Sequence, residues 1–94
     1  MNITGIIWLK EVAYKLWWKH NITTEEVEEV FENKPRYKFQ ERGNVRGENL
    51  YTVYGRTDAG RYLTIFFINK PNSEALIITA REMDRKERKR YVEK

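Results

Sequence analysis

The chain of 94 residues is long enough for one domain with a thin core, since a chain of this size hides only a little over ~60% of the surface that its unfolded form exposes. Its 40% hydrophobic and 34% charged residues are typical of globular proteins and not of disordered ones. The net charge of +4 favours anionic partners, although a merely solubilising surface carries as much. The absence of cysteine excludes disulfides, thiolate catalysis and cysteine-based zinc sites.

The first eight residues are apolar in places. They lack the basic start and the apolar run that a signal peptide or a membrane span requires. We therefore expect a cytoplasmic protein that does not associate with membranes.

The first helix is predicted over residues 10–20. Its apolar residues recur at helical spacing and form one stripe, which consists of Val12, Ala13, Leu16 and Trp17 and is extended by Leu9 and His20. Aromatic side chains bury large areas, so the early tryptophans are expected to help close the thin core: Trp8, Trp17 and Trp18.

A second helix is predicted to begin after Thr23. Thr23 and Glu26 have the spacing of a capping box, and Ile22 with Val27 supplies the hydrophobic staple. Pro35 ends this helix, because a proline pushes the preceding residue out of the helical region.

From residue 36 onward the hydrophobic period changes to two, which indicates strands over 36–40, 50–54, 62–68 and 76–80. Strand 62–68 is apolar on nearly both faces and is expected at the centre of the sheet. Residues 56–61 form a tight hairpin with Gly60 at a positive φ. A second capping box, Asp84 to Glu87, opens a short polar helix that reaches about Val92. Residues 6–8 are a candidate strand at an edge of the sheet.

These elements predict an α+β fold. Two N-terminal helices pack on an antiparallel sheet of about four strands, and a short C-terminal helix follows.

Metal and phosphate sites find little support in the sequence. One histidine, two aspartates and no cysteine leave no ligand cluster of recognisable spacing. The glutamates of residues 25–29 suit a solvated helix face better than a two-metal nuclease site, in which carboxylates converge in a pocket. Gly43 and Gly47 lack the spacing of a phosphate loop. We expect no metal and no cofactor.

His20 is the only side chain whose unperturbed pKa lies near neutrality, so a proton shuttle at pH 7 would use it first. The alternative is that it simply ends the first helix.

The arginines indicate a possible function more clearly than the single histidine does. Arg56 and Arg61 flank the hairpin, Arg81 closes the last strand, and residues 80–94 hold seven basic against four acidic groups. Guanidinium forks suit the phosphates of RNA, and four aromatic residues of the sheet are candidates for stacking on unpaired bases: Tyr37, Phe39, Tyr51 and Tyr54. The alternative is an ordinary solvated face, since acidic residues interleave with the basic ones.

Three stretches in chain order resemble one family. The family is that of the BrnT toxins. The start of their second helix is similar to residues 19–27 (KHNITTEEV), and their central hairpin is similar to residues 54–63 (YGRTDAGRYL). The end of their sequence is similar to residues 77–91, which run from IITAREM through RKER to Tyr91. Asn21 stands where the family commonly has glycine. The resemblance implies one toxin domain over residues 1–94, with a fold like that of the RelE-type ribonucleases. It also implies RNA cleavage without metal, and neutralisation by a cognate antitoxin that binds directly.

Metal-free cleavage of RNA needs a base for the 2′-hydroxyl, cations around the phosphate and an acid for the leaving 5′-oxygen. We assign Arg56 and Arg81 to the phosphate, His20 as acid or base, and Glu48 or Tyr91 as the complementary group. The remaining basic residues are expected to hold the RNA strand: Lys19, Arg61, Arg85 and Arg88. The alternative function is a non-catalytic module that binds RNA or a protein.

Overall fold

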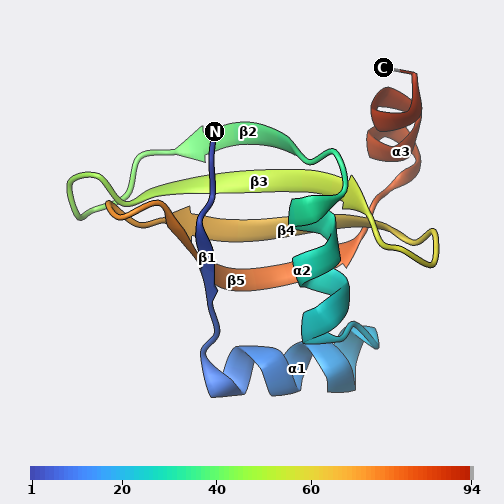
Figure 1. Ribbon diagram of the computed structural model, residues 1–94, viewed down its shortest axis with the longest axis horizontal. Helices are drawn as coiled ribbons and strands as arrows, with labels where there is room; N and C mark the ends of the chain where they lie inside the picture. The colour runs from blue at the N-terminus through green and yellow to red at the C-terminus, as the bar shows by residue number, and fades with distance from the viewer. Residues whose placement is uncertain (94) are drawn as a thin grey trace.

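The computed structural model describes residues 1–93. They form a five-stranded sheet of order β1-β5-β4-β3-β2, with α1 and α2 together on one side and α3 apart near one end (Figure 1). The elements are β1 (Gly5–Ile7), α1 (Lys10–His20), α2 (Thr24–Glu32), β2 (Arg36–Glu41), β3 (Asn49–Arg56), β4 (Tyr62–Asn69), β5 (Glu74–Glu82) and α3 (Arg85–Val92).

The predicted α+β architecture is confirmed, with one strand more than the four expected. β1 pairs with the start of β5 in parallel, so the sheet is mixed, whereas β2 to β5 are antiparallel as predicted. β4 is the central strand, and its residues Leu63, Thr64, Ile65 and Phe67 are fully buried.

The predicted bounds of α1 are confirmed, but its predicted apolar stripe is too wide. Leu16 is buried and Val12 packs against the core, whereas Trp17 is 56% exposed and Leu9 42% exposed. Trp18, which was expected to help close the core, is 65% exposed, and only Trp8 packs there. The helix rests on β5 through one narrow row of side chains, so a residue 100° around the helix from Leu16 already faces solvent.

The capping box that begins α2 is confirmed. The Thr23 hydroxyl accepts a hydrogen bond from the Glu26 amide, and the Glu26 carboxylate accepts one from the Thr23 amide, each at 3.0 Å. Ile22 and Val27 are both buried beside this cap. Lys34 has a φ of 49°, outside the right-handed helical region, as Pro35 predicts.

The alternation of strand residues gives the sheet two different faces. Val53, Ile65 and Phe67 point toward α1 and α2 and form the core with Leu16 and Val30. The opposite face, which we call the α3 face, carries Arg36, Tyr54, Arg56, Tyr62, Thr64, Phe66 and Arg81.

The short C-terminal helix begins at the predicted capping box of Asp84 and Glu87. It has no fully buried residue and is held at the sheet by polar and aromatic contacts. Within residues 1–93, no helix has the length and apolar character needed to cross a membrane.

Candidate functional site

Glu87 fastens α3 to the sheet. Its carboxylate accepts two hydrogen bonds from the Arg81 guanidinium, at 2.7 and 2.9 Å, and one from the Thr64 hydroxyl at 3.0 Å. The hydrogen bonds from Arg81 are the main reason why the pKa of Glu87 falls to about 2, and the bonds from the Asp84 amide and Thr64 lower it further against the effect of burial. Glu87 is therefore ionised at neutral pH and is a weak proton acceptor.

Four guanidinium groups lie over aromatic rings on the α3 face. Arg36 lies 5.3 Å from the centre of the Tyr91 ring, and Arg81 lies 5.7 Å from that of Phe66. Tyr62 has Arg88 at 4.5 Å and Arg56 at 5.7 Å. Such stacking orients the planar cation and leaves its edge free to donate hydrogen bonds.

A wide groove of about 910 Å³ opens where the hairpin, the end of α2 and α3 meet. Its cations are Lys34, Arg36 and Arg56, its carboxylates are Glu32 and Asp58, and the rings of Tyr62 and Tyr91 form part of its wall. Within residues 1–93, Arg36 and Arg56 make no ion pair, so their charge is available to an anion.

A narrower pocket of about 260 Å³ adjoins the groove, and Arg36 and Tyr91 line both. Its remaining wall comes from Tyr37, Lys38, Tyr54, Glu87 and Arg90. Tyr54 is partly buried there, and desolvation is the main cause of the raised pKa of its hydroxyl, with the charge of Glu87 adding to it.

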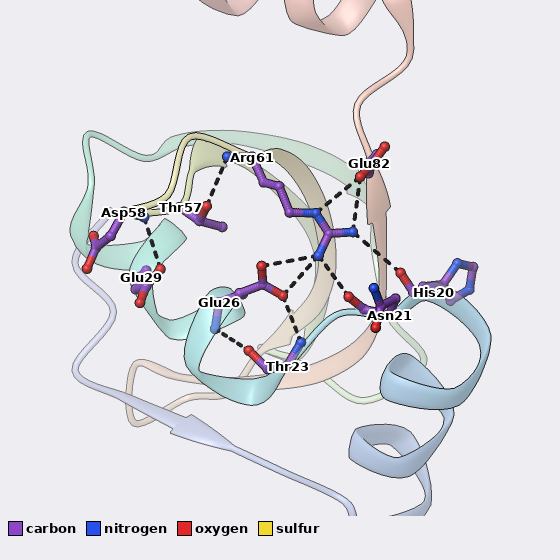
Figure 2. A network of polar contacts seen from close by, with 9 residues as sticks. All are labelled: His20, Asn21, Thr23, Glu26, Glu29, Thr57, Asp58, Arg61 and Glu82. Atoms are coloured by element: carbon purple, nitrogen blue, oxygen red, sulfur yellow. Dashed lines mark hydrogen bonds and ion pairs between the residues drawn. The ribbon is translucent and has the colours of Figure 1, made fainter.

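Arg61 lies in a different environment from Arg56, although the two flank the same hairpin. Its guanidinium donates to both Glu26 oxygens at 3.0 and 3.1 Å and to Glu82 at 3.0 and 3.1 Å (Figure 2). It also donates to the carbonyl oxygens of Asn21 and His20. Arg61 thus joins the α1–α2 turn to the sheet, and its charge is balanced by two carboxylates.

His20 contributes only its carbonyl oxygen to this network, and its imidazole extends away from Arg61 (Figure 2). Arg81 and Glu82 are successive strand residues, so the Arg81 side chain lies on the face opposite to Arg61. The structure does not bring the His20 imidazole together with Arg56, Arg81 and Tyr91. Lys19, its neighbour in α1, is likewise exposed on the helical side.

Glu48 also lies far from the groove. It precedes β3, whereas Arg56 ends this strand, and eight residues of strand span about 26 Å. The β2–β3 loop and α3 accordingly lie at opposite ends of the sheet in Figure 1. The Glu48 carboxylate accepts a hydrogen bond from the Lys70 ammonium at 2.8 Å.

Five of the nine predicted site residues gather near α3: Arg56, Arg81, Arg85, Arg88 and Tyr91. The Tyr91 hydroxyl donates to the Lys34 carbonyl oxygen at 3.0 Å and so ties α3 to the α2–β2 turn. Arg85 and Arg88 are exposed on α3. Sequence reasoning missed Arg36, Lys38 and Arg90 as site residues, although the alternation of β2 already puts Arg36 and Lys38 on one face.

The aromatic residues predicted to stack on bases do not share a face. Tyr37, Phe39 and Tyr51 are on the α1–α2 side, where Tyr37 and Tyr51 contact the ring of Phe67. Tyr54 points to the α3 face, beside the cations, and Tyr37 borders the narrow pocket there although its ring packs against Phe67. The four residues therefore divide between the two faces of the sheet, and their stacking on unpaired bases stays a prediction.

Within residues 1–93, no group of three potential metal-ligating side chains lies close enough to hold an ion. The α3 face carries guanidinium groups stacked on aromatic rings beside a groove. This arrangement suits the phosphate backbone of a nucleic acid.

Comparison with protein families supports this interpretation. Residues 8–87 match the family described as "Ribonuclease toxin, BrnT, of type II toxin-antitoxin system". None of the curated proteins matches the chain. Because the matched segment covers most of the sequence, including the hairpin and Glu87, the chain belongs to the BrnT family of ribonuclease toxins.

Proposed function

We propose that this protein cleaves single-stranded RNA in the cytoplasm, without a metal ion, and that the cut is made in the groove beneath α3. The observation that carries this proposal is the set of guanidinium groups stacked on aromatic rings around the groove. Membership of a ribonuclease toxin family supplies the reaction type.

Arg36, Arg56 and Lys34 hold the phosphates in this proposal, since all three line the groove. As the 2′-hydroxyl attacks the phosphorus, negative charge grows on the phosphate oxygens, and fixed cations stabilise it. Arg81 serves differently, because both of its terminal nitrogens already donate to Glu87. Its task is to hold α3 in place.

Two groove residues complete the proton transfers. Glu32 makes no hydrogen bond with its carboxylate within residues 1–93 and takes the proton of the attacking 2′-hydroxyl. The Tyr91 hydroxyl lines the same groove; it exchanges its hydrogen bond to the Lys34 carbonyl oxygen for one to the 5′-oxygen and gives that oxygen a proton as its bond to phosphorus breaks. The products are a 2′,3′-cyclic phosphate and a free 5′-hydroxyl, and the proton held by Glu32 returns through water to the Tyr91 phenolate, which restores both groups.

The test is cleavage of end-labelled single-stranded RNA in excess EDTA. We expect Arg56→Ala and Glu32→Gln to lower the rate at least tenfold, as removal of an electrostatic or proton-transfer group does. Arg46→Ala is the matched control, because Arg46 is an exposed arginine in the loop at the other end of the sheet. Equal rates for all three variants and the unmodified protein would refute the proposal.

The role of His20 stays a prediction that the same assay tests. Because its imidazole extends away from the Arg61 network and His20 does not line the groove, we expect His20→Gln to keep its cleavage rate. A loss matching that of Arg56→Ala would assign a catalytic proton transfer to His20.

Neutralisation by a cognate antitoxin is the second part of the proposal, and the outer side of α1 supports it. Tyr14, Trp17 and Trp18 are 66%, 56% and 65% exposed and lie three and four residues apart, so they share one side of the helix. Exposed aromatic clusters of this kind mark protein interfaces. Lys10 and Lys15 flank them, which fits an antitoxin segment with apolar side chains between carboxylates.

Growth rescue measures this interaction. Expression of the protein is expected to arrest growth, and co-expression of the antitoxin to restore it. A Trp17→Ala, Trp18→Ala double variant should still arrest growth but escape rescue. Rescue as complete as for the unmodified toxin would exclude this surface.

A further inference from the structure

The narrow pocket beside the groove has a composition unlike that of a simple anion site. Most of its wall is apolar. Arg36, Lys38 and Arg90 supply positive charge, while the one carboxylate, Glu87, is already engaged by Arg81. The pocket therefore fits a flat, uncharged group that is attached to an anionic chain.

The size of the pocket limits what enters it. Its volume of about 260 Å³ lies just below the range of about 300 to 1,000 Å³ found for sites of drug-sized ligands. One nucleobase suits such a space, whereas a base pair does not. Nucleobases have the required character, because each has an apolar π-face and hangs from a phosphate chain.

Tyr54 adds a polar group that lacks a partner. Its hydroxyl makes no hydrogen bond within residues 1–93, although desolvation is strong enough to raise its pKa. The hydroxyl is therefore free to exchange a hydrogen bond with water for one with a ligand that bears a donor or an acceptor. The edge of a nucleobase carries both.

The pocket and the groove share Arg36 and Tyr91, which makes them two parts of one surface. A strand with its phosphate in the groove has its neighbouring nucleotide beside the pocket. Arg36, stacked on the Tyr91 ring at 5.3 Å, lies where the phosphate between the two would pass.

We propose that this pocket binds one unpaired nucleobase of the RNA, stacked against Tyr54 and Tyr91, and so selects the nucleotide next to the cut. This inference rests on the proposed function and deepens it. It assigns to Tyr54, Lys38 and Arg90 a place in substrate recognition.

The test uses a 2′-O-methyl hexanucleotide, which lacks the attacking hydroxyl, and six versions of it with an abasic site at one position each. Binding is measured by fluorescence anisotropy. We expect the removal of the base at one position to weaken binding about 5- to 150-fold, the range for one stacked base. Tyr54→Ala should bind all seven oligonucleotides with similar affinity, and Tyr54→Phe should keep the preference for the intact one in weakened form.

Phe39→Ala is the matched control, since Phe39 is a 51% exposed aromatic residue of β2 on the opposite face. The inference is overturned if all abasic versions bind the unmodified protein as tightly as the intact strand while binding still depends on Arg56. It is equally overturned if Phe39→Ala loses the discrimination and Tyr54→Ala keeps it. Binding that no longer depends on Arg56 would instead count against the proposed function itself.

Discussion

Replacing Glu87 by glutamine removes the charge that fastens α3 to the sheet and keeps a side chain of nearly the same shape. The carboxylate accepts hydrogen bonds from Arg81, Thr64 and the Asp84 amide. A glutamine oxygen still accepts from the amide and from one further donor, so the cap of α3 survives. What is lost is the charge-assisted, two-pronged bond with Arg81.

The magnitude follows from the pKa. Arg81 is the largest cause that lowers the pKa of Glu87 from 4.5 to about 2, and this difference would correspond to roughly 3 kcal/mol at 1.36 kcal/mol per pKa unit. The Arg81 side chain is 39% exposed, so water screens the pair and we expect ~1 to 2 kcal/mol. Between about pH 2 and pH 4.5, the folded and the ordinary pKa of Glu87, the unfolded chain binds the proton and the folded chain does not. The contribution is therefore complete above pH ~5 and is lost as the pH falls toward 2.

Urea unfolding followed by circular dichroism at pH 7, 4 and 2.5 measures this contribution. We expect Glu87→Gln to be ~1 to 2 kcal/mol less stable than the unmodified protein at pH 7, with a difference that shrinks steadily as the pH falls. Glu41→Gln serves as the control, because Glu41 is exposed and makes no ion pair within residues 1–93. A destabilisation by Glu87→Gln that is the same at all three pH values would refute the reasoning.

Four further substitutions test the fold and the charge of the groove. Gly55→Ala should cost ~1 to 3 kcal/mol of unfolding free energy, because the new Cβ would lie 2.6 Å from the Val30 Cγ1 and 3.1 Å from its carbonyl oxygen; an unchanged urea midpoint would contradict this packing. Leu16→Ala should cost ~2 to 5 kcal/mol, whereas Trp17→Ala should stay within ~0.5 kcal/mol; similar losses for both would mean that α1 is turned differently. Arg56→Ala should reduce the slope of log K against log salt for RNA binding by about 0.7, the value for one phosphate contact on a single strand, and a slope equal to that of the unmodified protein would remove Arg56 from the phosphates.

Local signals in the sequence were sufficient for most of the fold. Thr23 with Glu26 and Asp84 with Glu87 have the spacing of capping boxes, and both boxes form because they depend only on residues three apart. The strands run longer than the alternation indicated, since β3 and β5 continue into residues that pair without being apolar. β1 pairs with a strand about 70 residues away, and its three residues carry too short a pattern to reveal a parallel partner.

The site was harder to predict, because ion pairs between distant residues leave no mark on the sequence. Arg56 and Arg61 look equivalent beside the same hairpin, yet Arg61 is neutralised by Glu26 and Glu82, which lie 35 and 21 residues away. Glu48 is held in the same way by Lys70. For Tyr51 the alternation alone indicates the side, since it is in phase with the buried Val53 of β3, whereas none of residues 36–41 is buried and β2 gives no such guide for Tyr37.

The central claim is that RNA binds the α3 face of the sheet, and the most direct test is an NMR titration of the ¹⁵N-labelled protein with the 2′-O-methyl hexanucleotide. We expect the largest amide shifts at Arg36, Tyr54, Arg56, Tyr62 and Tyr91, and little change in α1 and in the loop of residues 42–48. Shifts concentrated on α1 or on that loop, with the α3 face unaffected, would contradict this claim.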